Sequence, residues 1–342
     1  MPAPTTPAQR PVAVWLAEDF LPEERRAIRS LTVILRTIGC QWRKCTMCSF
    51  WQESAPVTQA DVLTQMAYAL QSSPAEEFVL KIFTSGSFLD EREITAETRR
   101  AIAEMVRERT RLRKLIVETR PEFVTPTRLE DFTGGAQLEL AIGLETADEC
   151  IRSTSINKGF TFAEYQQAAE TARDCSATVK TYLLLKPPWV SEKQAIEDVI
   201  RSAERVSPYS STISLNLCNI QRHTLLETLW RRGYYRPPWL WSALEAITAI
   251  AKRDLVVLSD PVGAGYRRGP HNCGSCDRAI TAAIKRFNAT QDLSVLTRLD
   301  ELECACRDVW HTLMGRDAFL FGSLPYLERK VNKRAHELVA YE

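Results

Sequence analysis

From Leu31 onward, short β-rich runs alternate with longer amphipathic segments, and this alternation limits the folds open to the chain. Six runs predict strands: Leu31–Thr37, Phe78–Phe83, Lys114–Thr119, Leu138–Gly143, Val179–Leu185 and Thr212–Leu217. The segments between them predict helices, for example at Thr58–Gln71, Ala96–Arg109, Phe162–Ala172 and Glu192–Val206. Repeated strand–helix units form right-handed parallel crossovers, so we expect an α/β fold, either an open doubly wound sheet or a barrel.

The number of units favours a partial barrel. Six units are too few for a closed eight-stranded barrel, and the phosphate-binding fingerprints GxGxxG and GxxxxGK are absent after every strand. We therefore predict a partial (β/α)6 barrel over residues 31–260, preceded by a flexible, proline-rich tail and lead-in over residues 1–30. After Leu217 the alternation weakens, and residues 261–342 are predicted to form a small, mostly helical segment held by a metal.

Composition and charge narrow the functional classes. The first eleven residues lack the apolar run of a signal peptide, and no stretch approaches the twenty apolar residues that span a bilayer, so we expect a cytoplasmic protein without a membrane partner. The formal net charge is +1, so any nucleic-acid binding must be local or shared with a partner. Ten cysteines in a reducing compartment indicate metal chemistry rather than disulfides.

A first cysteine cluster follows the first predicted parallel strand. Cys40, Cys45 and Cys48 lie within nine residues, where the loop would emerge at the carboxyl edge of a barrel. Three ligands are one short of a closed tetrahedral site. Three interpretations remain open: a 4Fe-4S cluster with one iron free for a small molecule, a structural zinc that borrows a distant ligand, or three unrelated buried cysteines.

The spacing resembles that of the radical S-adenosylmethionine (SAM) superfamily. Cx4CxxC, with the large apolar Met47 before the last cysteine and a (β/α)6 run behind it, is similar to the superfamily's cluster motif, although Cx3CxxC is more common. The resemblance implies that Cys40, Cys45 and Cys48 hold a 4Fe-4S cluster and that Met47 lies at the SAM site. It also implies that SAM binds the open iron and that its reductive cleavage, with electrons from a donor, starts radical chemistry.

Other strand ends extend the resemblance. Ser85, Gly86 and Ser87 follow the second strand, where the superfamily has a glycine-containing loop that holds the SAM amino group. The stretches "VETRPEFV" and "AIGLET" resemble the Elongator-like branch, which implies that three residues line the cofactor and substrate mouth: Glu118, Arg120 and Glu145. Surface ion pairs or strand-end caps are the alternative. Lys186, after the fifth strand, is a candidate for a substrate carboxylate or phosphate, or else a surface lysine.

A second cysteine cluster lies near the C-terminus. Cys273, Cys276, Cys304 and Cys306 supply a full set of four thiolates, with His271 as an alternative ligand. Closed four-thiolate sites are usually structural zinc, so we expect zinc that staples the C-terminal segment, or else a second iron–sulfur cluster. The remaining cysteines are expected to be small buried hydrophobic residues: Cys150, Cys175 and Cys218.

The whole set of motifs, over about Leu31–Trp310, resembles the radical SAM subunits of archaeosine synthases. The resemblance implies a carbon–nitrogen lyase acting on tRNA whose position 15 carries a lysine-modified 7-deazaguanine, with a lysine transferase as protein partner. Candidate RNA contacts are Arg231–Trp241 and Gly265–His271, unless these aromatic residues are packed under the barrel. Two alternatives remain: another radical SAM enzyme that modifies tRNA, and a non-catalytic, zinc-stapled RNA-binding protein.

Overall fold

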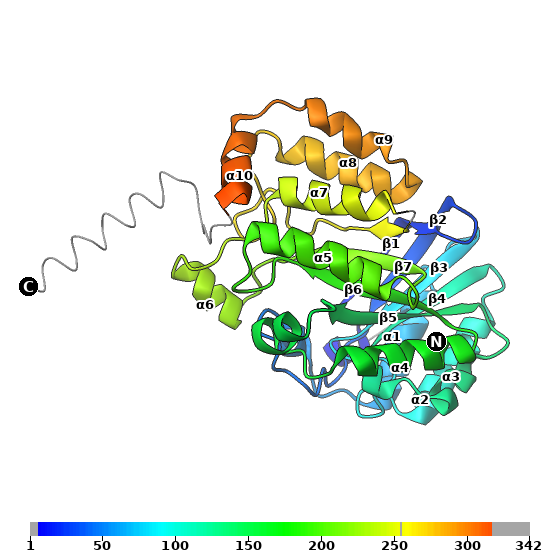
Figure 1. Cartoon of the computed structure of the whole chain (residues 1–342). Coiled ribbons are helices and arrows are strands. Elements are labelled where there is room, and N and C mark those ends of the chain that lie inside the picture. The colour runs from blue at the N-terminus through cyan, green and yellow to red at the C-terminus, as the bar shows by residue number, and fades with distance from the viewer. Residues whose placement is uncertain (1–5, 254, 317–342) are drawn as a thin grey trace, which may run out of the picture.

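The computed structural model describes residues 6–253 and 255–316, and its centre is one eight-stranded sheet (Figure 1). The strands are β1 (Ala13–Leu21), β2 (Arg26–Ile34), β3 (Phe78–Phe83), β4 (Leu112–Thr119), β5 (Gln137–Glu145), β6 (Thr178–Leu185), β7 (Thr212–Leu217) and β8 (Val257–Leu258). They lie in chain order, and neighbours from β2 to β8 are parallel, whereas β1 and β2 are antiparallel. This half-barrel confirms the predicted α/β class, and β2 to β7 are the six predicted strands.

Helices connect the strands. The α-helices are α1 (Gln59–Leu70), α2 (Ala96–Arg107), α3 (Pro126–Leu129), α4 (Phe162–Asp174), α5 (Glu192–Val206), α6 (Leu225–Arg231), α7 (Leu240–Ala251), α8 (Asp277–Thr290), α9 (Ser294–Thr297) and α10 (Ala305–Arg316). A π-helix spans Ile151–Ile156, and short 3-10 turns lie at Pro7–Gln9, Phe50–Glu53, Pro121–Phe123, Glu130–Phe132 and Arg298–Glu301. Capping boxes start α1, α4 and α5, because each box satisfies free N–H groups in the first turn. All three helices begin within one residue of the predicted positions. No helix in the described part of the chain is long and apolar enough to cross a membrane.

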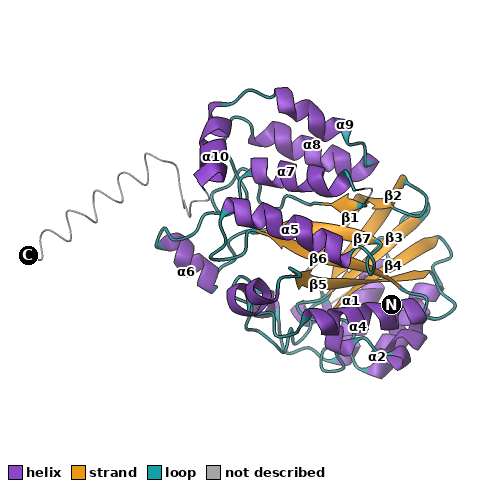
Figure 2. Cartoon of the chain, viewed as in Figure 1, coloured by secondary structure: helices purple, strands orange, loops and turns teal. Residues whose placement is uncertain are grey.

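The two faces of the sheet differ in chemistry. Figure 2 shows the strands between α1, α2 and α4 on one flank and α7 to α9 on the other, and one continuous apolar core joins the outer face to these helices. The inner face has a small apolar cluster around Ile116 and Ala141, with charged side chains next to it. These charges are paired: Lys81 with Asp19 (2.6 Å), and Glu139 with both Lys114 (3.2 Å) and Lys180 (3.7 Å). The inner face of the half-barrel therefore combines a small apolar cluster with charges that pair with one another.

The lead-in to the barrel contains a strand that the sequence did not reveal. Residues 13–21 lie in the stretch expected to be a tail and lead-in, yet they form β1, which hydrogen-bonds along the whole of β2. A tight turn joins the two strands, with Arg25 at φ 48°. Residues 13–21 read AVWLAEDFL, in which five apolar residues in a row replace a two-residue alternation, and this hid the strand from a pattern-based prediction.

The C-terminal segment is helical as far as it is described. Helices α8, α9 and α10 cover the region predicted to be helical up to residue 316, and the remainder of that prediction, residues 317–342, lies outside the described residues. Ile280, Ile284 and Phe287 of α8 belong to the same core as the barrel strands. The segment therefore shares the core of the barrel instead of having one of its own.

Candidate active site

The three cysteines of the first cluster lie in the loop after β2, at the carboxyl edge of the sheet. Cys40, Cys45 and Cys48 are half-buried free thiols. Backbone hydrogen bonds attach this loop to three other segments: Cys40 N–H to the Ser85 carbonyl (3.3 Å), Thr46 N–H to the Ile156 carbonyl (3.0 Å), and Leu226 N–H to the Thr46 carbonyl (3.1 Å). The loop is therefore ordered by the protein around it.

The four-residue gap between Cys40 and Cys45 has a structural role. Arg43 takes the left-handed conformation (φ 52°), which turns the chain back. Its guanidinium donates to the carbonyl of Cys40 (2.7 Å) and to that of Ile38 (2.8 Å). The gap thus contains a turn that the side chain of Arg43 closes.

The Ser85–Ser87 loop after β3 packs directly on the cysteine loop. A Cβ added at Gly86 would lie 2.6 Å from Cys40 Cα and 2.7 Å from Cys40 N, so only glycine permits this approach. Ser87 N–H donates to Glu93 (2.7 Å), while the Ser85 hydroxyl is buried and has no hydrogen-bond partner among the described residues. A buried hydroxyl without a partner is costly unless a ligand completes it, so the loop fits a polar group such as the amino acid part of SAM.

Glu93 is a functional candidate that sequence reasoning missed. Its carboxyl accepts from the Thr37 hydroxyl (2.5 Å) as well as from Ser87 N–H, and so joins the loops after β2 and β3. Burial raises the pKa of Glu93 to about 7. No motif marked this residue, because it lies in an irregular segment and acts only through tertiary contacts.

The strand ends of β4 and β5 bring the predicted mouth residues together. Burial raises the pKa of Cys45, and Lys158, Glu145 and Arg120 lie close enough to add smaller electrostatic effects. Lys158 Nζ is 2.7 Å from Glu145 Oε1, and Glu145 has a strained φ of 70° after a register shift in β5. Glu118 is half-buried on the inner face beside Tyr182, and burial raises its pKa to about 7.

Arg120 is held in place by the cysteine loop. Its guanidinium lies over the ring of Trp42 (5.6 Å) and bonds to Glu122 (2.6 Å) and to the Lys158 carbonyl (3.1 Å). Trp42 in turn donates to the Asn157 carbonyl (2.7 Å). Trp42 and Lys158 were not predicted, because a tryptophan and a loop lysine carry no motif of their own.

Two further candidates are placed at the ends of β6 and β7. Met47 packs against an apolar cluster that includes Leu184, Cys218 and Tyr235. Lys186 is buried, with φ 62°, and its ammonium forms an ion pair with Glu192 (2.7 Å). Lys186 is therefore not a surface lysine, and its burial lowers its pKa.

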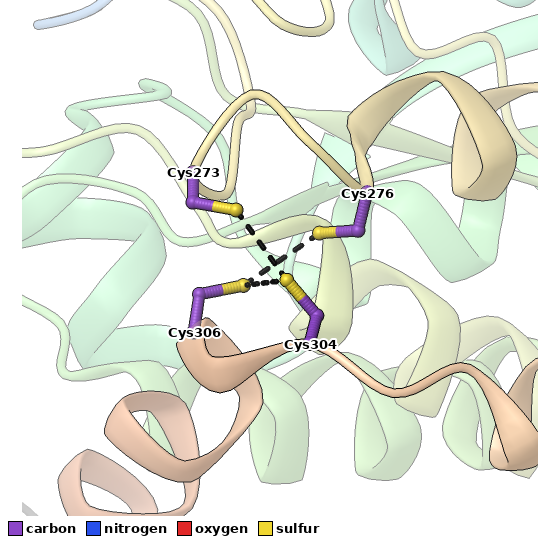
Figure 3. A group of neighbouring side chains, drawn as sticks. All are labelled: Cys273, Cys276, Cys304 and Cys306. Carbon is purple, nitrogen blue, oxygen red and sulfur yellow. Dashed lines mark hydrogen bonds between the residues drawn. The ribbon is translucent and has the colours of Figure 1, made fainter.

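The second cysteine cluster is compact. The ligand atoms of Cys273, Cys276, Cys304 and Cys306 all lie within 4.8 Å of one another (Figure 3). Their sulfurs approach to 3.5–3.6 Å, too far for a disulfide at about 2.05 Å and close to the roughly 3.8 Å edge of a tetrahedron with 2.3 Å metal–sulfur bonds. The four thiols therefore fit a single metal ion, and the nearby His271 instead bonds to the Gly269 carbonyl (2.8 Å).

Neighbouring side chains support this second cluster. Trp241 Nε1 donates to Cys306 Sγ and Asn272 Nδ2 donates to Cys276 Sγ, both at 3.2 Å. Donors of this kind stabilise thiolate charge and orient the ligands of a metal.

A hydrogen-bond chain links the second cluster to the barrel. Trp310, on the helix that begins beside Cys306, donates to Ser242 (2.9 Å), and Ser242 donates to Glu192 (2.6 Å). Glu192 is the ion-pair partner of Lys186 at the end of β6.

Two of the three single cysteines differ from expectation. Cys218 is buried as predicted, but Cys150 is exposed and Cys175 only half-buried.

Of the two candidate RNA segments, much of the first is packed inside: Tyr235, Trp239 and Trp241 are buried. These aromatic residues near α7 are therefore packed in the interior, which was the alternative to an RNA contact.

The partial barrel, with a three-cysteine loop after its first parallel strand and a glycine loop after the second, has the arrangement expected from the resemblance to the radical SAM superfamily. No family model matches the chain. It is 43% identical over 329 residues to archaeosine synthase subunit beta of Methanosarcina acetivorans, covering 93% of this chain and 94% of that protein. It is 42% identical to archaeosine synthase subunit beta of Thermococcus kodakarensis, covering 88% and 95%. The chain belongs to the archaeosine synthase subunit beta family.

A solved structure also resembles this fold. The queuine lyase from Clostridium spiroforme, bound to SAM and queuine, matches with a TM-score of 0.47 and 19% identity, covering 60% of this chain and 81% of that one.

Proposed function

We propose that the chain is the radical SAM subunit of an archaeosine synthase and a carbon–nitrogen lyase. Its substrate is tRNA whose 7-deazaguanine carries a lysine attached through the side-chain nitrogen. Cleavage of the bond between the lysine carbon and that nitrogen leaves the formamidine of archaeosine on the base. The supporting observation is the 43% identity to an archaeosine synthase subunit beta over nearly the full length of both chains.

The cysteine loop and the Ser85–Ser87 loop are the cofactor site in this proposal. Cys40, Cys45 and Cys48 hold three irons of a 4Fe-4S cluster, and the fourth iron is left for SAM. The partnerless Ser85 hydroxyl supports a polar ligand at this place. When bound, the cluster and SAM supply a radical that removes hydrogen from a carbon that ordinary acids and bases do not activate.

The chain's own residues then orient the substrate and handle protons. Arg120 and the Lys158–Glu145 pair lie at the mouth beside the cysteine loop, where they can bind the charged groups of a lysine. Burial raises the pKa of Glu118 to about 7, so at neutral pH its carboxyl is suited to give a proton to, or take one from, the nitrogen that is released from the lysine carbon and stays on the base. Lys186 holds the β6 end through Glu192.

The second cysteine cluster is a structural zinc site in this proposal. A 4Fe-4S cluster binds each thiolate through a different iron and so spreads them apart, whereas these sulfurs lie within 4.8 Å, as around one ion. The partners are the lysine transferase subunit, an electron donor and tRNA.

The test is anaerobic incubation of the reconstituted protein, its transferase partner, SAM and a reductant with lysine-modified tRNA, followed by mass spectrometry of the nucleosides. We expect archaeosine to appear, and the Cys45→Ala variant to form none. An iron-loaded protein that cleaves SAM yet leaves the modified base unchanged would refute the proposed substrate. A colourless, zinc-only protein after reconstitution would refute the radical class and favour a zinc-stapled RNA-binding protein.

A further inference from the structure

Three segments far apart in sequence join into one surface beside the cysteine loop. They are residues 38–54, which contain that loop, residues 220–236 around α6, and residues 262–271. Leu226 N–H bonds to the Thr46 carbonyl (3.1 Å), and Ser49 N–H bonds to Gln221 (2.6 Å). Arg268 exchanges bonds with the Ile220 backbone (2.7 and 3.1 Å). We call the exposed side chains of these three segments the basic rim.

The basic rim concentrates positive charge on a chain that has almost none in total. The three segments contain eight lysines and arginines against two glutamates, so they carry +6, while the whole chain carries +1. Of the two glutamates, Glu227 is buried and forms ion pairs with Arg231 and Arg268 (2.9 Å each). The rest of the chain is therefore net acidic, and the near-neutral total hides a local cationic surface.

Most of these cations face solvent. The exposed members are Arg43, Lys44, Arg222, Arg231, Arg232 and Arg267. Figure 1 shows α6, at the centre of the set, standing out from the body of the molecule. A projecting cationic element can follow a phosphate backbone without a clash between the two bodies.

Aromatic side chains are exposed among the cations. Tyr266 is 74% exposed, Phe50 is 53% exposed and Tyr234 is 44% exposed. The loop under Tyr266 is internally bonded, with Tyr266 N–H on the Gly263 carbonyl (3.2 Å) and Gly269 N–H on the Tyr266 carbonyl (2.9 Å). A rigid loop thus presents an aromatic ring next to arginines, the combination on which unpaired bases stack.

We propose that the basic rim is the tRNA-binding surface of this chain: its arginines hold phosphates that flank the target nucleotide, and Tyr266 stacks on an unpaired base. This rests on the proposed function. An acidic protein partner would also be attracted by the charge, but RNA is favoured because exposed rings alternate with arginines and because the rim includes the cysteine loop, where the target base must enter.

The decisive variant is Arg222→Glu with Arg267→Glu, because both side chains are exposed on the basic rim and neither lies in a helix or strand. The matched control is Arg278→Glu with Arg286→Glu, two exposed arginines of α8. Binding of an unmodified tRNA transcript to the full chain is measured from about 50 to 200 mM salt. We expect the rim variant to bind at least about tenfold more weakly and to lower the salt slope by about two, because each arginine neutralises about one phosphate.

Further variants separate charge from structure. Arg222→Lys with Arg267→Lys retains the charge and is expected to keep most of the affinity, whereas Tyr266→Ala is expected to lose about fivefold or more with an unchanged salt slope. Iron content and circular dichroism check that each variant is folded.

Each of the following three outcomes would overturn the inference. Equal tRNA affinity of the rim variant and the α8 control would show that the rim does not contact RNA. No tRNA binding by the wild-type chain would show that the partner alone delivers the substrate. Loss of transferase binding with unchanged tRNA affinity would show that the rim is a protein interface. Archaeosine formation by the assembled complex is scored separately, so the proposed function can survive all three results.

Discussion

Gly86→Ala should force the Ser85–Ser87 loop and the cysteine loop apart. The added Cβ would lie 1.9 Å from Glu93 Oε1, 2.6 Å from Cys40 Cα and 2.7 Å from Cys40 N. The Glu93 side chain can rotate away, but two of the three atoms are backbone of a proposed cluster ligand. Because the φ of Gly86 lies outside the left-handed region, the effect is steric and not a matter of backbone preference.

The cost can be approximated from these distances. Overpacking of this kind costs about 1–3 kcal/mol. Moving the loops apart weakens the hydrogen bond from Cys40 N–H to the Ser85 carbonyl (3.3 Å), and rotation of Glu93 weakens the one from Ser87 N–H to Glu93 (2.7 Å), each worth about 1 kcal/mol. A total near 3 kcal/mol corresponds to about a hundredfold loss in affinity for a ligand that needs both loops in register.

The assay compares Gly86→Ala with Gly135→Ala after anaerobic reconstitution. A Cβ at Gly135 would lie 3.4 Å from the Phe132 carbonyl oxygen and 3.5 Å from Arg107 Cγ, which is ordinary contact. Iron content, the thiolate-to-iron absorption band and SAM affinity are measured on both. We expect the control to match wild type and Gly86→Ala to hold less iron and bind SAM weakly, with a similar circular dichroism spectrum. Wild-type iron content and SAM affinity in Gly86→Ala would refute the close approach of the two loops.

Three other predictions concern charge and metal. Burial raises the pKa of Asp198 to about 6, so the folded state binds an extra proton there between about pH 4 and 6, and this group should lower stability by about 3 kcal/mol as pH rises through that window. In denaturant titrations at several pH values, Asp198→Asn should remove this share of the slope and leave the share of Glu93 and Glu118, whose pKa values are also raised. Glu145→Gln leaves the Lys158 ammonium without its carboxylate and should cost about 1–3 kcal/mol by urea unfolding, much of it recovered when Lys158→Met is added. A zinc chelator, or Cys276→Ala, should lower the melting temperature by several degrees, whereas Cys45→Ala should leave it nearly unchanged.

The regular elements were predictable because their signals are local. β3 and β7 have the predicted bounds, and α5 begins and ends at the predicted residues, since its Ser191 cap and its periodicity are both in the sequence. β1 was missed because its pairing with β2, and not its own pattern, makes it a strand.

The candidate site was predictable only in part. The cysteines were found because metal ligands cluster in sequence, and Glu145 because it ends a strand. Glu93, Lys158 and Trp42 come from irregular segments and reach the cysteine loop only through the tertiary fold, so no sequence pattern marks them. The same limit applies to the buried Trp239, whose aromatic, arginine-rich surroundings suggested a surface.

The two cysteine clusters differ in the number of cysteines because different contacts fix the segments that carry them. The first loop is bonded to the segments after β3, after β5 and at α6 through Cys40, Thr46 and Leu226, so the protein keeps its shape without a fourth ligand. The second cluster joins the loop before α8 to the start of α10, and these two segments meet at the sulfurs of all four cysteines. The ion proposed there would supply the link that backbone hydrogen bonds supply at the first loop. In the proposed function, the first cluster would therefore leave a coordination position open for chemistry, whereas the second would be closed because its ligands hold two segments together.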